Sequence, residues 1–168
     1  MIVLRPTPAF AYSHPAHIIA FGFGAGLARV APGTFGTLVA WAPGWLLAGA
    51  HPAVIFPLVA ALFLLGVWAC GVTGRHLGVH DHGSMVWDEI VAFLLVAALL
   101  PRGLQWQVAG FVLFRGFDIG KPPPIRWIER RWQGGFGVMF DDLVAASYTY
   151  VVLIVIVLAE HKYLQGAP

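Results

Sequence analysis

Residues 30–74, VAPGTFGTLVAWAPGWLLAGAHPAVIFPLVAALFLLGVWACGVTG, contain no Asp, Glu, Lys or Arg. A transmembrane helix needs roughly 20 predominantly apolar residues, so this stretch is long enough for two spans with a turn at residues 50–52. The whole chain has the same character: 59% of its 168 residues are hydrophobic and 11% are charged, whereas soluble proteins average about 25% charged residues. The sequence therefore predicts an integral membrane protein.

Apolar runs between polar breaks predict five helices, over 36–50, 53–74, 86–100, 104–118 and 142–159. The Gly-rich segment before them, IIAFGFGAGLARVAPG, suits a short amphipathic or re-entrant piece better than a span. We expect an all-α membrane bundle of about four to five transmembrane helices with a short N-terminal interfacial helix. It forms one domain over 1–168, with an N-terminal arm at 1–15 and a C-terminal tail at 160–168. The N-terminus has no apolar run typical of a cleavable signal peptide.

Basic residues predict the orientation of this bundle. The segment 120–135 carries Lys121, Arg126, Arg130 and Arg131, the densest basic cluster in the chain. Because cytoplasmic loops of membrane proteins are enriched in Lys and Arg, this loop is expected in the cytoplasm. Counting spans from it also places the 75–85 loop in the cytoplasm, and the turns at 51–52 and 101–103 outside.

This orientation gathers acidic residues at one membrane level. Six of the chain's eight acids fall there: Asp81, Asp88, Glu89, Asp118, Asp141 and Asp142. One acid could simply stabilise a helix N-terminus, but a second beside it adds like-charge repulsion. Ionisable residues at membrane depth usually mark a functional site. A Mg²⁺ ion would offset the repulsion, because it binds carboxylates together with substrate phosphate.

Other polar residues allow two interpretations each. Arg115 and Asp118 could be an intrahelical pair with Lys121 reaching the interface, or the two cations could clamp a phosphate. Thr34, in APGTFGTL at 31–38, could cap a helix within a structural turn or contribute to an anion site. His80 and His82 are expected to line their loop rather than bind a metal. Cys70 is expected to be a small residue of the core or of the lipid-facing surface.

Four segments, APGTFGTL, HDHGSMVWDEIVAF, GFVLFRGFDIGKPPPIRW and GGFGVMFDDLVAA, together resemble the phosphatidylglycerophosphatase A family over residues 31 to 146. Members are small bacterial membrane enzymes that hydrolyse phosphatidylglycerophosphate to phosphatidylglycerol and inorganic phosphate with Mg²⁺, in phosphatidylglycerol and cardiolipin biosynthesis. Ala92 and Ala146 replace glycines of many relatives. The resemblance implies catalytic residues Asp88, Asp118, Asp141 and Asp142; metal ligands Asp81, Asp88, Glu89, Asp141 and Asp142; and phosphate-binding residues Thr34, Arg115 and Lys121.

The expected protein is thus a multi-pass phosphatase of the bacterial inner membrane, with its site at the cytoplasmic face and a lipid substrate. The net charge of +2 is too small to indicate a nucleic-acid partner. A small cation or proton transporter could use the same carboxylates, but transporters place such groups near the middle of the bilayer. A purely structural subunit leaves the acids unexplained. Direct attack by water is favoured over a phospho-aspartate; the number of metal ions, the acyl-chain preference and the oligomeric state are left open.

Overall fold

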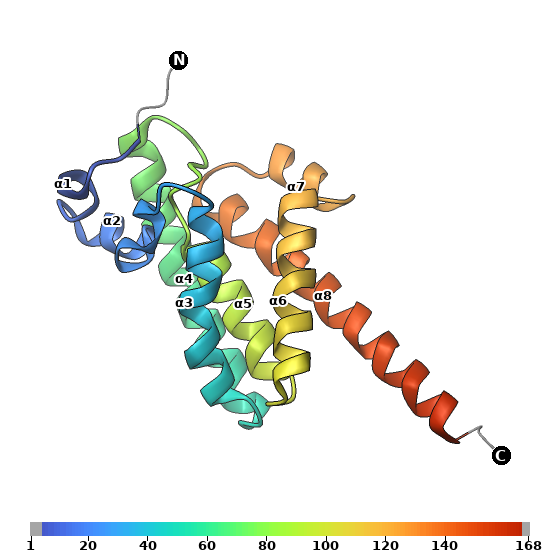
Figure 1. The fold of residues 1–168 in the computed structure, drawn as a ribbon. Coiled ribbons are helices and arrows are strands. Elements are labelled where there is room, and N and C mark those ends of the chain that lie inside the picture. The colour runs from blue at the N-terminus through green and yellow to red at the C-terminus, as the bar shows by residue number, and fades with distance from the viewer. Residues whose placement is uncertain (1–4, 166–168) are drawn as a thin grey trace.

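A computed structural model describes residues 5–165, and this part of the chain is helical without strands (Figure 1). The all-α prediction is therefore confirmed. The elements are α1 (Pro8–Ala11), α2 (Pro15–Ala20), the 3₁₀ helix η1 (Gly22–Leu27), α3 (Pro32–Leu47), α4 (Pro52–Leu77), α5 (Trp87–Leu99), α6 (Leu104–Gly120), α7 (Ile125–Arg131) and α8 (Gly134–Gln165). The five expected apolar helices correspond to α3, α4, α5, α6 and α8.

Helix α5 lies at the centre of the bundle. It packs against α3, α4, α6 and α8, and ten of its 13 residues are buried. A helix that is apolar on all sides lies either in a protein core or in lipid, and α5 is covered by its neighbours. At about 1.5 Å per residue it is only about 20 Å long, shorter than a hydrocarbon core of about 30 Å. Because protein surrounds α5, its length does not have to match that of the bilayer.

Prolines and glycines fix where the helices begin and end. Pro32 and Pro52 occupy the first turns of α3 and α4, where a missing N–H costs nothing. Gly78 ends α4 with a φ of 71°, a left-handed conformation that glycine adopts readily. The chain then alternates in direction, so the starts of α3, α5 and α8 meet the ends of α4 and α6 at one end of the bundle (Figure 1).

The turns 48–51 and 100–103 lie together at the opposite end. The indole N–H of Trp45 donates to the carbonyl of Arg102 at 3.1 Å, and Nε of Arg102 donates to the carbonyl of Ala48 at 3.1 Å. These two bonds join the α3–α4 turn to the α5–α6 turn. The bundle therefore has one end closed by turns and another end where the acidic segments gather.

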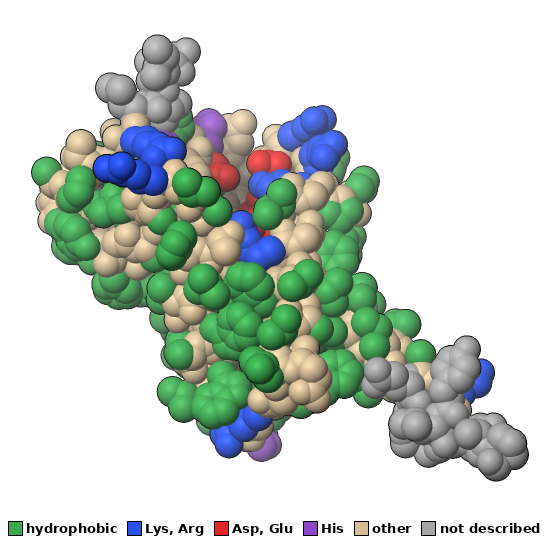
Figure 2. All heavy atoms as spheres, viewed as in Figure 1, with side chains coloured by type: hydrophobic (Ala, Val, Ile, Leu, Met, Phe, Trp, Pro, Cys, Tyr) green, Lys and Arg blue, Asp and Glu red, His purple; other side chains and the backbone are tan. Residues whose placement is uncertain are grey.

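Two helices, α4 over Pro52–Leu77 and α8 over Gly134–Ala159, are long and apolar enough to cross a membrane. In the most apolar stretch of each, only 28% of the residues are buried, so most of their apolar side chains face outward. Figure 2 shows hydrophobic side chains over much of the visible surface below the acidic end. This exposure favours lipid as the surrounding medium.

The structure corrects the sequence prediction around α7 and the start of α8. Residues 120–135 were expected as a loop, but α7 forms within it because Ile125 and Ile128 are buried and α7 packs against α8. Helix α8 begins at Gly134 rather than at 142. A Cβ at Gly135 would overlap the carbonyl of Val67, so glycine allows α8 to approach α4 closely. The helix also continues to Gln165, through part of the expected tail.

Candidate active site

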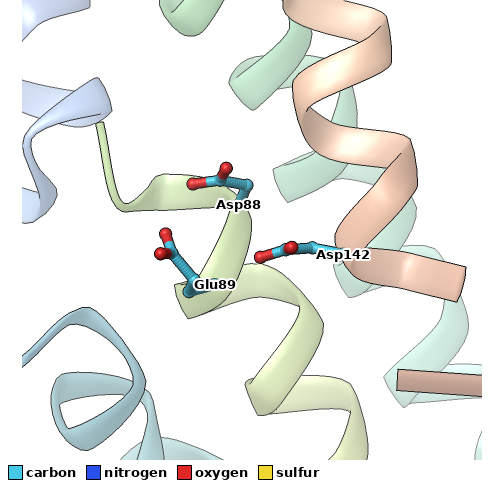
Figure 3. A group of neighbouring side chains, drawn as sticks. All are labelled: Asp88, Glu89 and Asp142. Atoms are coloured by element: carbon cyan, nitrogen blue, oxygen red, sulfur yellow. The ribbon is translucent and has the colours of Figure 1, made fainter. Parts of the chain in front are cut away.

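Three carboxylates from two helices meet at the acidic end of the bundle (Figure 3). Asp88 and Glu89 lie in the first turn of α5, and Asp142 lies on α8. One oxygen of each lies within 4.8 Å of the others. The α5–α8 packing thus joins residues that are far apart in the sequence, and this arrangement is suited to binding a cation.

Each of these carboxylates has an oxygen that is buried and unbonded. Asp88 Oδ1, Glu89 Oε2 and Asp142 Oδ2 have no hydrogen-bond partner within residues 5–165. Asp88 and Asp142 are only 7% and 3% exposed. Unpaired buried carboxylates are costly unless a cation or a proton offsets their charge. The donor set, all hard oxygen, fits Mg²⁺ or a similar divalent ion.

Arg115 brings positive charge to this cluster. Its guanidinium pairs with Asp118 one turn further along α6, and its Nη1 lies 3.6 Å from Glu89 Oε1. The intrahelical pair considered from the sequence is therefore present, and the same side chain also reaches the cluster. Its Nε is buried and has no hydrogen-bond partner in the described chain. Arg115 thus keeps donor capacity for an anion at this place.

The start of α3 lies directly against the cluster. A Cβ at Gly33 would overlap the carboxylate of Glu89 and lie 3.1 Å from Nη2 of Arg115. Of the two interpretations of Thr34, the helix cap does not hold, because Ala31 occupies the cap position; its contribution to an anion site stays a prediction. Thr34 instead lies in the first turn, half-buried, and its N–H donates to the Ala31 carbonyl at 2.9 Å.

Asp141 belongs to a second group beside the first. Its Oδ2 lies 3.0 Å from Nζ of Lys121, and the same ammonium lies 2.8 Å from Oε1 of Glu129 on α7. Asp81 joins Asp141 and Glu129 in lining a hollow of about 170 Å³. Neighbouring residues on an α-helix point about 100° apart, so Asp142 faces Asp88 whereas Asp141 faces Lys121.

Glu129, which pairs with Lys121, was not among the site residues predicted from the sequence. Its position in the basic segment, eight residues after Lys121, was a sign that it could pair with a cation there. His82 accepts a hydrogen bond from the backbone N–H of Ser84 at 3.1 Å, which agrees with the expectation that it lines its loop. Cys70 is buried, the first of its two expected positions.

Residues 18–157 match the family model for Phosphatidylglycerophosphatase A. The chain belongs to the phosphatidylglycerophosphatase A family. The family predicted from the sequence is therefore confirmed, and the chain is an enzyme of the phosphoric monoester hydrolase class.

Curated relatives cover nearly the whole chain. A Phosphatidylglycerophosphatase A of Haemophilus influenzae is 44% identical over 90% of this chain and 94% of its own length. One of Escherichia coli is 45% identical over 84% of this chain and 83% of its own length. A Bacteroides thetaiotaomicron protein with a provisional phosphatidylinositol-3-phosphatase name is 34% identical over 82% of this chain and 91% of its own length. No solved structure matches.

Proposed function

We propose that this protein hydrolyses phosphatidylglycerophosphate to phosphatidylglycerol and inorganic phosphate, with Mg²⁺ as cofactor. Two relatives at 44% and 45% identity bear the name of this activity. The observation that carries the proposal is the set of three buried, unbonded carboxylate oxygens beside Arg115. Such a site combines metal ligands with a cation that can bind phosphate oxygens.

Asp88, Glu89 and Asp142 would hold the ion. Bound there, Mg²⁺ would supply a Lewis acid for the phosphoryl group and lower the pKa of a bound water. Arg115 would donate hydrogen bonds to the phosphate, and Asp118, paired with Arg115 on the same helix, would orient the guanidinium. The carboxylate cluster would thus hold the metal ion, and Arg115 on α6 would orient the phosphate.

Lys121 would add a second positive charge at the edge of the site. In this structure Asp141 and Glu129 hold its ammonium. Lys acts toward phosphate as a mobile point charge, so it can leave Glu129 for a phosphate oxygen while staying near Asp141. Asp81 would complete the acidic rim, next to Asp141.

We expect water, rather than an aspartate, to attack phosphorus, because metal-activated water requires no further motif. Acid-quench trapping with labelled substrate tests this choice. A chemically competent acyl-phosphate on the enzyme would refute direct attack.

The site is proposed to lie at the cytoplasmic face of the inner membrane, in a bundle with four to five spans. Exposed Arg126, Arg130 and Arg131 on α7 support this side, because cytoplasmic segments are enriched in basic residues. Trp127 on the same short helix is 62% exposed, and tryptophan is enriched at membrane–water interfaces. Helix α7 would then lie at headgroup level, beside the site.

The transporter alternative predicts carboxylates near the middle of the helices. Here Asp88 and Glu89 occupy the first turn of α5, and Arg115 and Asp118 lie near the end of α6. The deciding experiment is phosphate release from phosphatidylglycerophosphate by the purified protein, with Mg²⁺ or with EDTA. We expect release only with Mg²⁺ and little release by Asp88→Asn. Full activity of Asp88→Asn would refute the metal-site assignment.

A further inference from the structure

A groove lies between α3 and α6 on the side of the bundle. Its hollow has a volume of about 520 Å³. Leu38, Trp41, Ala42 and Trp45 of α3 form one wall, Leu104 and Gln107 of α6 form the other, and Arg102 lies at its end. Leu38, Trp45 and Leu104 are exposed, so the groove opens sideways, toward the lipid that would surround the bundle.

Both walls continue to the candidate active site. On α3, one face carries Thr34, Leu38, Trp41 and Trp45, at intervals of three and four residues. On α6, the corresponding face carries Arg115, Phe111, Gln107 and Leu104. Each face is polar where it meets the carboxylate cluster and mainly apolar further away. The two faces therefore match a lipid whose phosphate lies at the carboxylate cluster and whose acyl chain lies along the apolar part.

The length of the two faces also fits a lipid. Trp45 is eleven residues from Thr34, and Leu104 is eleven residues from Arg115, which corresponds to about 16 Å along each helix. One leaflet accounts for half of a hydrocarbon core of about 30 Å. An acyl chain long enough to cross one leaflet would therefore be about as long as these two faces.

Helices α3 and α6 pack against α5 and have few contacts with each other. Trp41 of α3 stacks on Phe111 of α6, with ring centroids 5.3 Å apart, and Phe93 of α5 packs edge-on against both rings. These three rings form an aromatic floor where α3 and α6 meet α5. By contrast, glycines bring the neighbouring helices into close contact: a Cβ at Gly44 of α3 would lie 2.6 Å from Ala97 Cβ on α5.

We propose that an acyl chain of the lipid phosphate substrate binds in this α3–α6 groove, above the Trp41–Phe111–Phe93 floor. The proposal rests on the proposed function and adds the route by which the lipid enters. The proposed phosphate donor Arg115 lies on α6 and is close to the start of α3 at Gly33, so a lipid phosphate held by Arg115 would extend its glycerol and acyl chains along these two helices. Lateral entry follows, with the chain passing directly from the bilayer into the groove.

Ala42→Phe tests the groove by filling it. Ala42 is eight residues from Thr34, about 12 Å along α3, and an eighteen-carbon chain in the groove contacts this stretch more extensively than a six-carbon chain. Kinetics are compared for dioleoyl and dihexanoyl phosphatidylglycerophosphate in mixed micelles. Loss of contact with two methylene groups corresponds to about a tenfold weaker binding, so we expect about that rise in KM for the dioleoyl lipid and a smaller rise for the dihexanoyl lipid. Ala60→Phe, at an exposed alanine on α4, should behave as the wild type.

Equal effects on both lipids, or no effect on either, would overturn the groove assignment. Failure of the wild type to hydrolyse either lipid would refute the proposed function instead. A second measurement needs no variant: a phosphatidylglycerophosphate with a diazirine near the end of one acyl chain is photolysed with the wild type. Labels should map to 38–45 or 104–111 and disappear with excess dioleoyl lipid. Labels confined to α4 or α8 would contradict the proposal.

Discussion

Asp142→Asn should make the protein more stable in EDTA but remove most of its stabilisation by Mg²⁺. The reason is the cluster geometry, in which oxygens of Asp88, Glu89 and Asp142 lie within 4.8 Å of one another. Without a cation, these carboxylates repel each other, and the variant removes one charge of the three. With Mg²⁺, the same substitution removes a ligand. The two conditions therefore predict effects of opposite sign.

The size of the stability gain in EDTA follows from the distance between the carboxylate oxygens, which is at most 4.8 Å. At an effective dielectric constant of about 20, two like charges at this separation repel by about 3 kcal/mol. A carboxylate that takes up a proton relieves part of this repulsion, so we expect the variant to gain about 1–3 kcal/mol in EDTA. Since 1 kcal/mol shifts the melting temperature of a protein of this size by about 2–4 °C, the gain corresponds to several degrees.

Thermal unfolding followed by tryptophan fluorescence in detergent, with EDTA or with Mg²⁺, measures this effect. Asp141→Asn is the matched control, because Asp141 is paired with Lys121 at 3.0 Å. Removing its charge leaves that ammonium with one partner fewer, so this variant should lose about 1–3 kcal/mol in EDTA. If Mg²⁺ stabilised Asp142→Asn as much as the wild type, the cluster would not be the metal site.

Three further predictions concern the surroundings of the cluster. Gly33→Ala should reduce activity at least about tenfold, because steric overlap in the site misplaces catalytic groups; Gly116→Ala, where an added Cβ meets nothing within 4 Å, should keep full activity in the same assay. Glu129→Gln should lower KM by up to about fivefold, because Lys121 would no longer have to leave an exposed ion pair worth about 0–1 kcal/mol to reach the phosphate; a raised KM would contradict the release of Lys121 from Glu129. Nε2 of His17 on α2 lies 2.8 Å from Nδ1 of His76 on α4, and burial lowers the pKa of His17 below its usual 6.5. As the pH falls, His17 therefore takes up a proton in the unfolded chain before it does so in the folded one, and the attachment of α2 to α4 should weaken below about pH 6.5; hydrogen exchange measures this, and pH-independent protection of α2 would contradict it.

The sequence predicted the main helices because their signal is local. An apolar run between polar breaks requires no knowledge of the neighbours, and α4, expected at 53–74, occupies Pro52–Leu77. Helix α7 lacks such a signal, since a seven-residue helix is unstable alone and depends on burying Ile125 and Ile128. The start of α8 was missed for a similar reason: glycine disfavours helices, and the contact of Gly135 with α4 is visible only in three dimensions.

The sequence predicted that the acidic residues lie at one membrane level, but it did not predict which of their side chains meet. Topology placed the acids at one membrane face, and the helix directions agree (Figure 1). It could not say which acids meet, because that depends on how α8 is rotated against α5. The unbonded oxygens of Asp88 and Asp142, like the Lys121–Glu129 pair, are properties of packing rather than of sequence spacing.

The neighbouring aspartates of α8 show how one helix can serve two electrostatic tasks. Asp142 points toward Asp88 and Glu89, where like charges favour a cation, whereas Asp141 points toward Lys121, where an ammonium already offsets its charge. Their backbone is shared, and the N–H of Asp142 donates to Oδ1 of Asp141 at 3.1 Å. A rotation of α8 that improves one contact must therefore change the other. Binding of a cation by Asp142 and release of Lys121 toward a phosphate would then be linked through a single turn of helix.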